Sequence, residues 1–142
     1  MSQKKYTADI LQKLDNLKSK TSLIPMDQYH DLLHNSDSPL LHNAAAYRRL
    51  VGKLIYLTIS RPDLSYAVHI VAQYMHSPRA IHLHVVLKLV RYLVTTASQG
   101  LFYAAKTNLV LVGFWDADWG GCKLTRQSLT GYCYTFGGTL IA

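Results

Sequence analysis

Apolar residues recur at helical spacing through the first two thirds of the chain. Tyr6 and Ile10, for example, are four residues apart and continue in register to Leu14 and Leu17. Between the first and second periodic stretches, residues 19–44 hold two prolines and scattered Ser, Asn and Asp, which predicts a long irregular connection. We expect Asp63 and Ser77 to act as N-caps, Ser77 with Pro78 at the first helical position. The pattern predicts helices over residues 4–18, 45–60, 64–75 and 77–95.

After Gly100 the period changes to that of β-strands. Short apolar runs bounded by Asn or Gly replace the helical pattern, and Gly137-Gly138 is typical of a hairpin turn. The fold class we expect is therefore α+β, with a helical region followed by a β-meander. A sheet that stops at its last short strand, with no helix to cover it, looks unfinished, so we expect a truncated domain. The predicted strands are residues 101–103, 109–115, 131–136 and 139–141.

Two carboxylates follow the most apolar of these strands, at Asp116 and Asp118. If the strand continues, residues two apart face the same side and both side chains can approach one divalent cation. Oxygen ligands of this kind, completed by water and substrate phosphates, suit Mg²⁺ or Mn²⁺. The alternative is a strand that leaves the core into a polar turn, where Asp and Gly are common.

Positive charge is concentrated in the middle of the chain. The 142 residues have a formal net charge of +7, and residues 47–106 hold eight basic side chains against Asp63 alone. Tyrosines are interleaved with these cations, a combination that could contact nucleic-acid phosphates. The alternative is a set of solvated helix faces with half-buried tyrosines. The candidate nucleic-acid-binding residues are Arg48, Arg49, Lys53, Arg61, Arg79, Lys88 and Arg91.

Composition excludes several other functions. All eight acidic residues are Asp, so no HExxH zinc site, Glu-based glycosidase pair or EF-hand is present. His30 and His34 have the spacing of a ligand pair, but no third ligand follows at zinc-finger spacing, and we interpret the histidines as surface or capping residues. The densest apolar stretch, residues 81–94, is interrupted by His, Lys and Arg, and two Cys do not make a disulfide framework. We therefore expect an intracellular protein, cytoplasmic or nuclear, that is neither secreted nor transmembrane.

The longer motifs together resemble copia-type retrotransposon Pol polyproteins. Residues 47–58 and 61–68 read YRRLVGKLIYLT and RPDLSYAV, similar to the family's YRxLVGxLxYLTxTRPDIxYAV block. Residues 113–122 read GFWDADWGGC and resemble GYxDADWAGC, and residues 126–133 read RQSLTGYC and resemble RRSTSGYC. The order of these blocks is also the family's order, so the resemblance covers nearly the whole chain.

The resemblance implies a junction between two enzymes. Residues 1–99 would be the C-terminal, thumb-and-connection-like part of a reverse transcriptase, and residues 100–142 the first strands of a truncated RNase H-like domain. Asp116 matches the first carboxylate of the RNase H site, which binds Mg²⁺ for phosphodiester hydrolysis. Asp118 belongs to the family pattern, and we interpret it as a supporting or structural residue; it is also the second candidate metal contact.

The resemblance also implies an incomplete catalytic set. The polymerase YxDD strand is missing upstream and the Glu-bearing RNase H helix is missing downstream. We therefore expect a fragment that is inactive by itself and binds an RNA–DNA hybrid or duplex weakly, with the remaining Pol segments as further partners. The alternatives are an active Mg²⁺-dependent nuclease that uses Asp116 with carboxylates from another chain, and a non-catalytic protein-interaction module.

Overall fold

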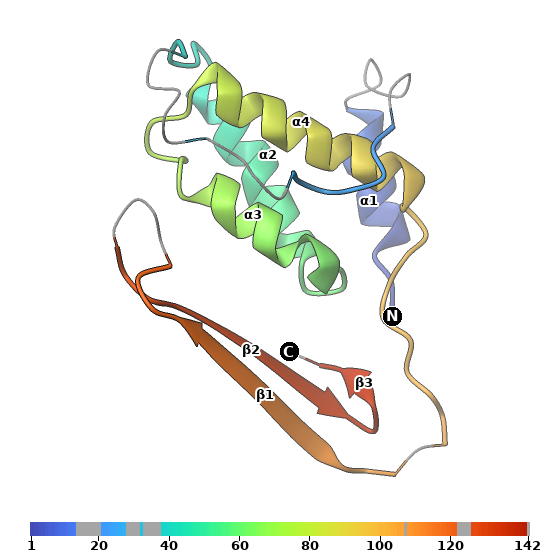
Figure 1. Ribbon diagram of the computed structural model, residues 1–142. Coiled ribbons are helices and arrows are strands. Elements are labelled where there is room, and N and C mark those ends of the chain that lie inside the picture. Colours follow the sequence, from blue (N-terminus) through green and yellow to red (C-terminus); the bar gives the residue numbers. More distant parts are fainter. Residues whose placement is uncertain (14–20, 28–31, 33–37, 107, 122–125, 142) are drawn as a thin grey trace. The chain divides into compact units, whose positions relative to one another are not determined.

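The computed structural model describes residues 1–13, 21–27, 32, 38–106, 108–121 and 126–141. The chain divides into two compact units. Ser2–Gly100 contains every helix of the described residues and is called the helical unit below. Leu101–Ala142, joined by Met1, contains the strands and is called the sheet unit (Figure 1). The fold class is α+β, as the change of period predicted.

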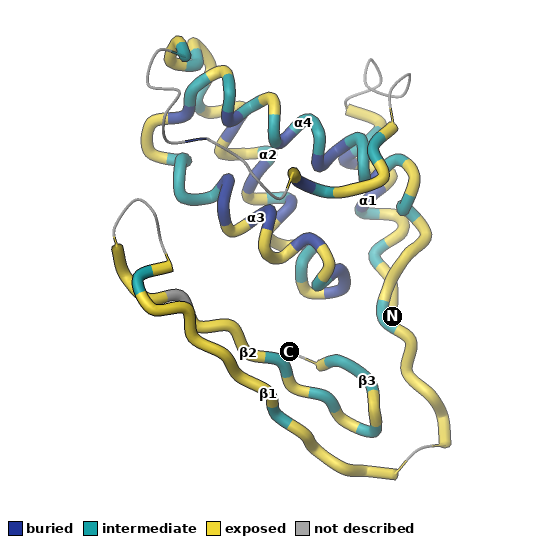
Figure 2. Tube along the Cα trace, in the orientation of Figure 1, coloured by how far each residue is buried: buried dark blue, intermediate teal, exposed yellow. Residues whose placement is uncertain are grey.

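The described residues of the helical unit form four α-helices, with a short 3-10 turn, η2 (Pro62–Leu64), before the third. Their apolar stripes meet in one core, and Figure 2 shows the buried residues in dark blue along the helices. Burying one such Leu, Ile or Val side chain contributes about 1.5–3 kcal/mol, so this core is the main source of stability in the helical unit. The helices are α1 (Lys4–Gln12), α2 (Ala44–Leu57), α3 (Ser65–Ala72) and α4 (Ala80–Thr95).

Local hydrogen bonds explain where α2 begins. Asn43 is its N-cap, and the Asn43 side-chain oxygen accepts from the Ala46 amide at 3.0 Å.

Two tyrosines join α2 to its neighbours. Tyr47 lies one turn after the N-cap and is almost fully buried, with its hydroxyl donating to the Val71 carbonyl at 2.6 Å. That bond joins α2 to α3. The edge-to-face packing of Tyr6 on Tyr56, with ring centroids 5.2 Å apart, joins α1 to α2.

The start of α4 differs from the prediction. Ser77 is not its N-cap: the helix begins at Ala80, and Arg79 precedes it in an extended conformation. The reason is a contact distant in sequence, because Pro39 and Ser38 supply the acceptors for the first amides. Ala80 donates to the Pro39 carbonyl at 2.9 Å, and Ile81 donates to the Ser38 hydroxyl at 3.1 Å.

Two further local predictions were wrong: the N-cap of α3 and the first strand. The end of the predicted first helix lies outside the described residues. Asp63 does not cap α3, because its carboxylate is bound by Arg61 and Tyr92 instead. Residues 101–103 are not a strand, since no described strand pairs with them. The predicted first helix extended to residue 18, and residues 14–18 are among those not described; His30 and His34 are likewise outside the described residues.

The sheet unit is a three-stranded antiparallel sheet in the order β1 (Leu111–Asp118), β2 (Leu129–Phe136) and β3 (Thr139–Leu140). Gly137 and Gly138 turn the chain between β2 and β3 with φ of 57° and 78°, as the Gly-Gly pair predicted. None of its described side chains is buried, and Figure 2 shows the sheet in yellow and teal. The described part of the sheet unit therefore has no core of its own.

Candidate carboxylate site and nucleic-acid interface

β1 continues through both candidate carboxylates. Asp116 is paired with Gly131 and Asp118 with Leu129, so the two Asp side chains leave the same face of the sheet. Both are exposed. A Cβ added at Gly131 would meet no atom within 4 Å, which leaves open space opposite Asp116.

The other face of the sheet is aromatic. Trp115 alternates with the carboxylates along β1, and its partner on β2 is Tyr132. Tyr134 follows on the same face, and its ring lies over Gly113, where an added Cβ would come within 2.7 Å of the ring. Trp115 and Tyr132 are 79% and 65% exposed. The face opposite the carboxylates is thus aromatic, whereas the carboxylate face also carries the exposed Phe114, two residues before the first Asp on β1.

The donor set at Asp116 is short of what a protein-only metal site needs. The Asp116 carboxylate accepts from the Ala117 amide at 2.9 Å, so one of its oxygens already has a partner. Within the described residues, no three His, Cys, Asp or Glu side chains gather closely enough to hold a metal ion. Two adjacent carboxylates fit Mg²⁺ only as part of a larger oxygen shell, in which water and substrate phosphates supply the other ligands.

Arg61 is not on the surface. It is only 2% exposed, and its guanidinium binds both oxygens of Asp63 at 2.9 and 2.8 Å. It also donates to the carbonyl and hydroxyl of Thr96, each at 2.8 Å, and so joins the turn after α2 to the end of α4. Tyr92 completes the cluster: its hydroxyl donates to Asp63 at 3.0 Å and its ring lies under the guanidinium.

The contacts of Arg61 and Asp63 explain the ionisation of both side chains. Burial alone would lower the pKa of Arg61, but the hydrogen bond and charge of Asp63 raise it above its usual value. Burial would also raise the pKa of Asp63, and the bound guanidinium with the Tyr92 hydroxyl holds it below its usual value. Both groups are charged at neutral pH, and all three guanidinium nitrogens of the arginine donate within the helical unit.

Three other predicted phosphate contacts are also engaged or partly covered. Arg79 donates to the Ser38 carbonyl at 2.6 Å, and Lys88 forms an ion pair with Asp27. Arg91 is half-buried, and its Nε has no hydrogen-bond partner among the described residues. The structure thus places these side chains on α4 and its start, and does not bring them together with the cations of α2.

Arg48, Arg49 and Lys53 remain together on α2. Arg48 and Arg49 are exposed, and Arg48 donates to the Met75 carbonyl at 3.3 Å. Arg49 and Lys53 are one helical turn apart and lie along the same side of the helix. Arg48 and Arg49 are the most accessible residues of the predicted basic surface.

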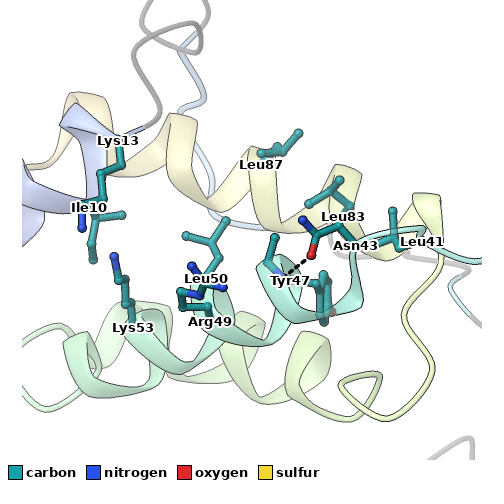
Figure 3. A pocket seen from close by; sticks show the side chains of 11 residues that line it. Ile10, Lys13, Leu41, Asn43, Tyr47, Arg49, Leu50, Lys53, Leu83 and Leu87 are labelled. Carbon is teal, nitrogen blue, oxygen red and sulfur yellow. Dashed lines mark hydrogen bonds between the residues drawn. The ribbon is translucent and has the colours of Figure 1, made fainter.

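A groove lies beside Arg49 and Lys53, and sequence reasoning missed it. Its volume is about 470 Å³, and Lys13, just after α1, reaches it from the opposite side (Figure 3). Lys13 was not among the predicted binding residues, because only the packing of α1 beside α2 brings it to the other two cations. The lining residues are Ile10, Lys13, Leu41, Asn43, Ala46, Tyr47, Arg49, Leu50, Lys53, Leu83 and Leu87.

Together these features define a two-unit α+β segment with a basic helical surface and a carboxylate pair on a strand. Several of its relatives are transposon proteins. The Pol polyprotein from transposon RE2 of Arabidopsis thaliana is 37% identical over 137 residues, which is 96% of this chain and 9% of the polyprotein. An uncharacterized mitochondrial protein of the same plant is 36% identical over 143 residues, 100% of this chain and 58% of that protein. The Pol polyprotein from transposon TNT 1-94 of Nicotiana tabacum is 28% identical over 148 residues.

The chain belongs to the copia-type retrotransposon Pol polyproteins and corresponds to one segment of them. It spans about a tenth of the length of the polyproteins it matches. No family model and no solved structure matches it. Within the part of the chain that the structure describes, no helix is long and apolar enough to cross a bilayer.

Proposed function

We propose that this chain is a nucleic-acid-binding segment of a copia-type Pol polyprotein and has no polymerase or nuclease activity by itself. The helical unit is the thumb-and-connection-like end of the reverse transcriptase, and the sheet unit is the beginning of an RNase H-like domain. The preferred ligand is an RNA–DNA hybrid or a duplex. The remaining Pol segments are the other partners.

The observation that carries the binding proposal is the set of accessible cations on α2. Arg48 and Arg49 are exposed, Lys53 is half-exposed, and no acidic residue of the described chain pairs with them. Phosphate contacts from such side chains release counterions, so affinity falls steeply with salt, by about 0.9 in log–log slope for each duplex phosphate contacted. Arg61 is not among the proposed phosphate contacts, because its guanidinium already binds Asp63 and Thr96.

The carboxylate pair supports the RNase H-like assignment and the lack of activity. Asp116 is the residue that would bind Mg²⁺, with Asp118 in support, and a bound Mg²⁺ supplies activated water for phosphodiester hydrolysis. The two side chains share an open face of the sheet, but the described residues add no third carboxylate near them. The chain's own contribution is therefore to bind and position, without completing the chemistry.

The binding proposal is tested by titrating a labelled RNA–DNA hybrid at several salt concentrations. Arg48→Gln/Arg49→Gln should weaken binding and reduce the salt slope by about two. The matched control is Lys4→Gln/Lys5→Gln, which removes two exposed cations of α1 and lowers the net charge equally. If both double variants lose the same affinity, net charge rather than the α2 surface explains the binding, and the proposal fails.

A second candidate function is favoured by the open space beside Asp116. A nuclease could form if another chain supplied the missing carboxylates on that face. Mg²⁺-dependent cleavage of a hybrid that rises with protein concentration and disappears in Asp116→Asn would establish it. If the 142-residue chain does not cleave the hybrid, the result supports the proposal that the segment is inactive by itself.

A further inference from the structure

The groove in the helical unit has the size and shape of a binding site. Its volume of about 470 Å³ lies within the range of about 300–1,000 Å³ typical of ligand pockets. A stripe of α2 side chains, Ala46, Arg49, Leu50 and Lys53, forms one wall over about 10 Å of helix. Leu83 and Leu87 of α4 form the opposite wall (Figure 3).

The described lining of the groove carries charge of one sign. Lys13, Arg49 and Lys53 all line it, and none of the lining residues that the structure describes is acidic. Lys13 and Lys53 extend from different helices toward the same end of the groove (Figure 3). Because like charges at one end of a groove repel each other, an anionic partner that reaches this end would be favoured.

The apolar surface of the groove selects aliphatic contacts over stacked bases. The half-buried Leu50, Leu83 and Leu87 provide this surface. Tyr47, the one aromatic residue of the described lining, is 1% exposed, and its hydroxyl donates to the Val71 carbonyl, so the described residues offer no aromatic face to a nucleobase. Proteins that bind single-stranded nucleic acid use such faces for stacking. This groove instead fits the side chains of a peptide.

The spacing of the cations indicates the conformation of that peptide. Arg49 and Lys53 are four residues apart on one helix, so their charges are separated by one turn. Carboxylates four residues apart on a partner helix have the same spacing, and apolar residues of an amphipathic helix commonly fill grooves between helices.

We propose that the groove between α2 and α4 binds an acidic amphipathic helix of a partner protein. Leu-like side chains of that helix enter the groove, while Asp or Glu side chains one turn apart face Arg49 and Lys53, and a further acid faces Lys13. This docking role goes beyond nucleic-acid binding and does not depend on it.

The test uses the full chain and a synthetic fluorescent helical peptide with Leu on one face and Glu beside it. Anisotropy titrations should give saturable binding that is lost when the Glu residues are replaced by Gln or the Leu residues by Ser. Arg49→Glu/Lys53→Glu should weaken binding about tenfold or more. The matched control Lys4→Glu/Lys5→Glu, which makes the same charge change outside the groove, should change affinity less than about twofold.

A second variant separates this proposal from the nucleic-acid surface. Leu87→Ser removes an apolar wall without changing charge, and circular dichroism checks that the variant is folded. We expect it to weaken peptide binding and to leave binding of the RNA–DNA hybrid unchanged. The docking proposal is overturned if the acidic peptide does not bind, if the Gln peptide binds equally well, or if Leu87→Ser affects the hybrid and not the peptide.

Discussion

At the scale of single residues, burial decides which cations are structural. Arg61 and Arg49 look equivalent in the sequence, since each belongs to a conspicuous basic motif. In the structure Arg61 is 2% exposed and bound to Asp63 and Thr96, whereas Arg49 is exposed beside the groove. The sequence pattern could not separate them, because the partner Thr96 is 35 residues away.

Replacing Arg61 should therefore affect stability. Arg61→Gln removes the bonds to Asp63 and Thr96 and leaves Asp63 without its cation, so we expect a loss of about 2–3 kcal/mol in the free energy of unfolding. Urea denaturation measures it. The exposed Arg48→Gln should stay within about 0.5 kcal/mol of the parent; an equal loss in both variants would contradict the structural role of Arg61.

His82 should make stability depend on pH. It is 2% exposed, stacks on Tyr74 at 3.9 Å and accepts the Arg79 amide at Nδ1. Burial lowers the pKa of His82, Leu32 partly opposes this, and the charge of Arg79 adds to it. Because the unfolded chain binds the proton more readily, stability is complete above the ordinary histidine pKa of about 6.5 and falls as pH drops below it.

The comparison variant is His82→Gln, which keeps an acceptor for the Arg79 amide and cannot take up a proton in this range. Unfolding free energies measured between pH 7 and pH 5 should fall less for this variant than for the parent. A parent and variant with the same pH dependence would show that His82 is not the responsible group.

At the scale of elements, distant contacts set boundaries that local pattern predicts only approximately. The helical period located α2, α3 and α4, and the Gly-Gly pair located the β2–β3 turn. The start of α4 was misplaced because its first amides are bound by Ser38 and Pro39, about 40 residues earlier in the chain. Period alone contains no information about such a partner.

This boundary gives a direct comparison of two serines. Ser38→Ala removes the acceptor for the Ile81 amide and should cost about 1 kcal/mol, as loss of a side-chain cap does. Ser77→Ala changes the residue that the sequence favoured as the cap, and should change the unfolding free energy by less than about 0.5 kcal/mol. Thermal or urea denaturation of the two variants measures this. If Ser77→Ala lost more stability than Ser38→Ala, Ser77 would be the N-cap of α4, and the helix would begin earlier than in the structure.

At the scale of the whole molecule, the two units differ in how much they bury. The described core side chains belong to the helical unit, and the sheet unit buries none of its described residues. The sequence predicted both the α+β class and the family, because period and motif are local properties. It could not assign which cations are free, since that depends on how helices pack.

Hydrogen exchange should report this difference directly. Amides of α2 and α4 near Leu54 and Leu89 should exchange only through global opening of the helical unit, whereas those of β1 and β2 should exchange much faster. Mass spectrometry or NMR of the full chain measures both sets in one sample. Equal protection in the two units would mean that the sheet is held by contacts that the described residues do not contain.

The order of the strands has a consequence for how the chain behaves in solution. β1 is an edge strand of the described sheet, and residues 109–115 read LVLVGFW, without charge or proline. An exposed edge of this composition is a template for pairing between molecules. Asp116 and Asp118, at its end, then act as gatekeepers whose repulsion limits stacking of copies. Replacing the two Asp residues with neutral ones for a metal-binding assay should lower solubility. The concentration at which each variant precipitates should therefore be measured together with its activity.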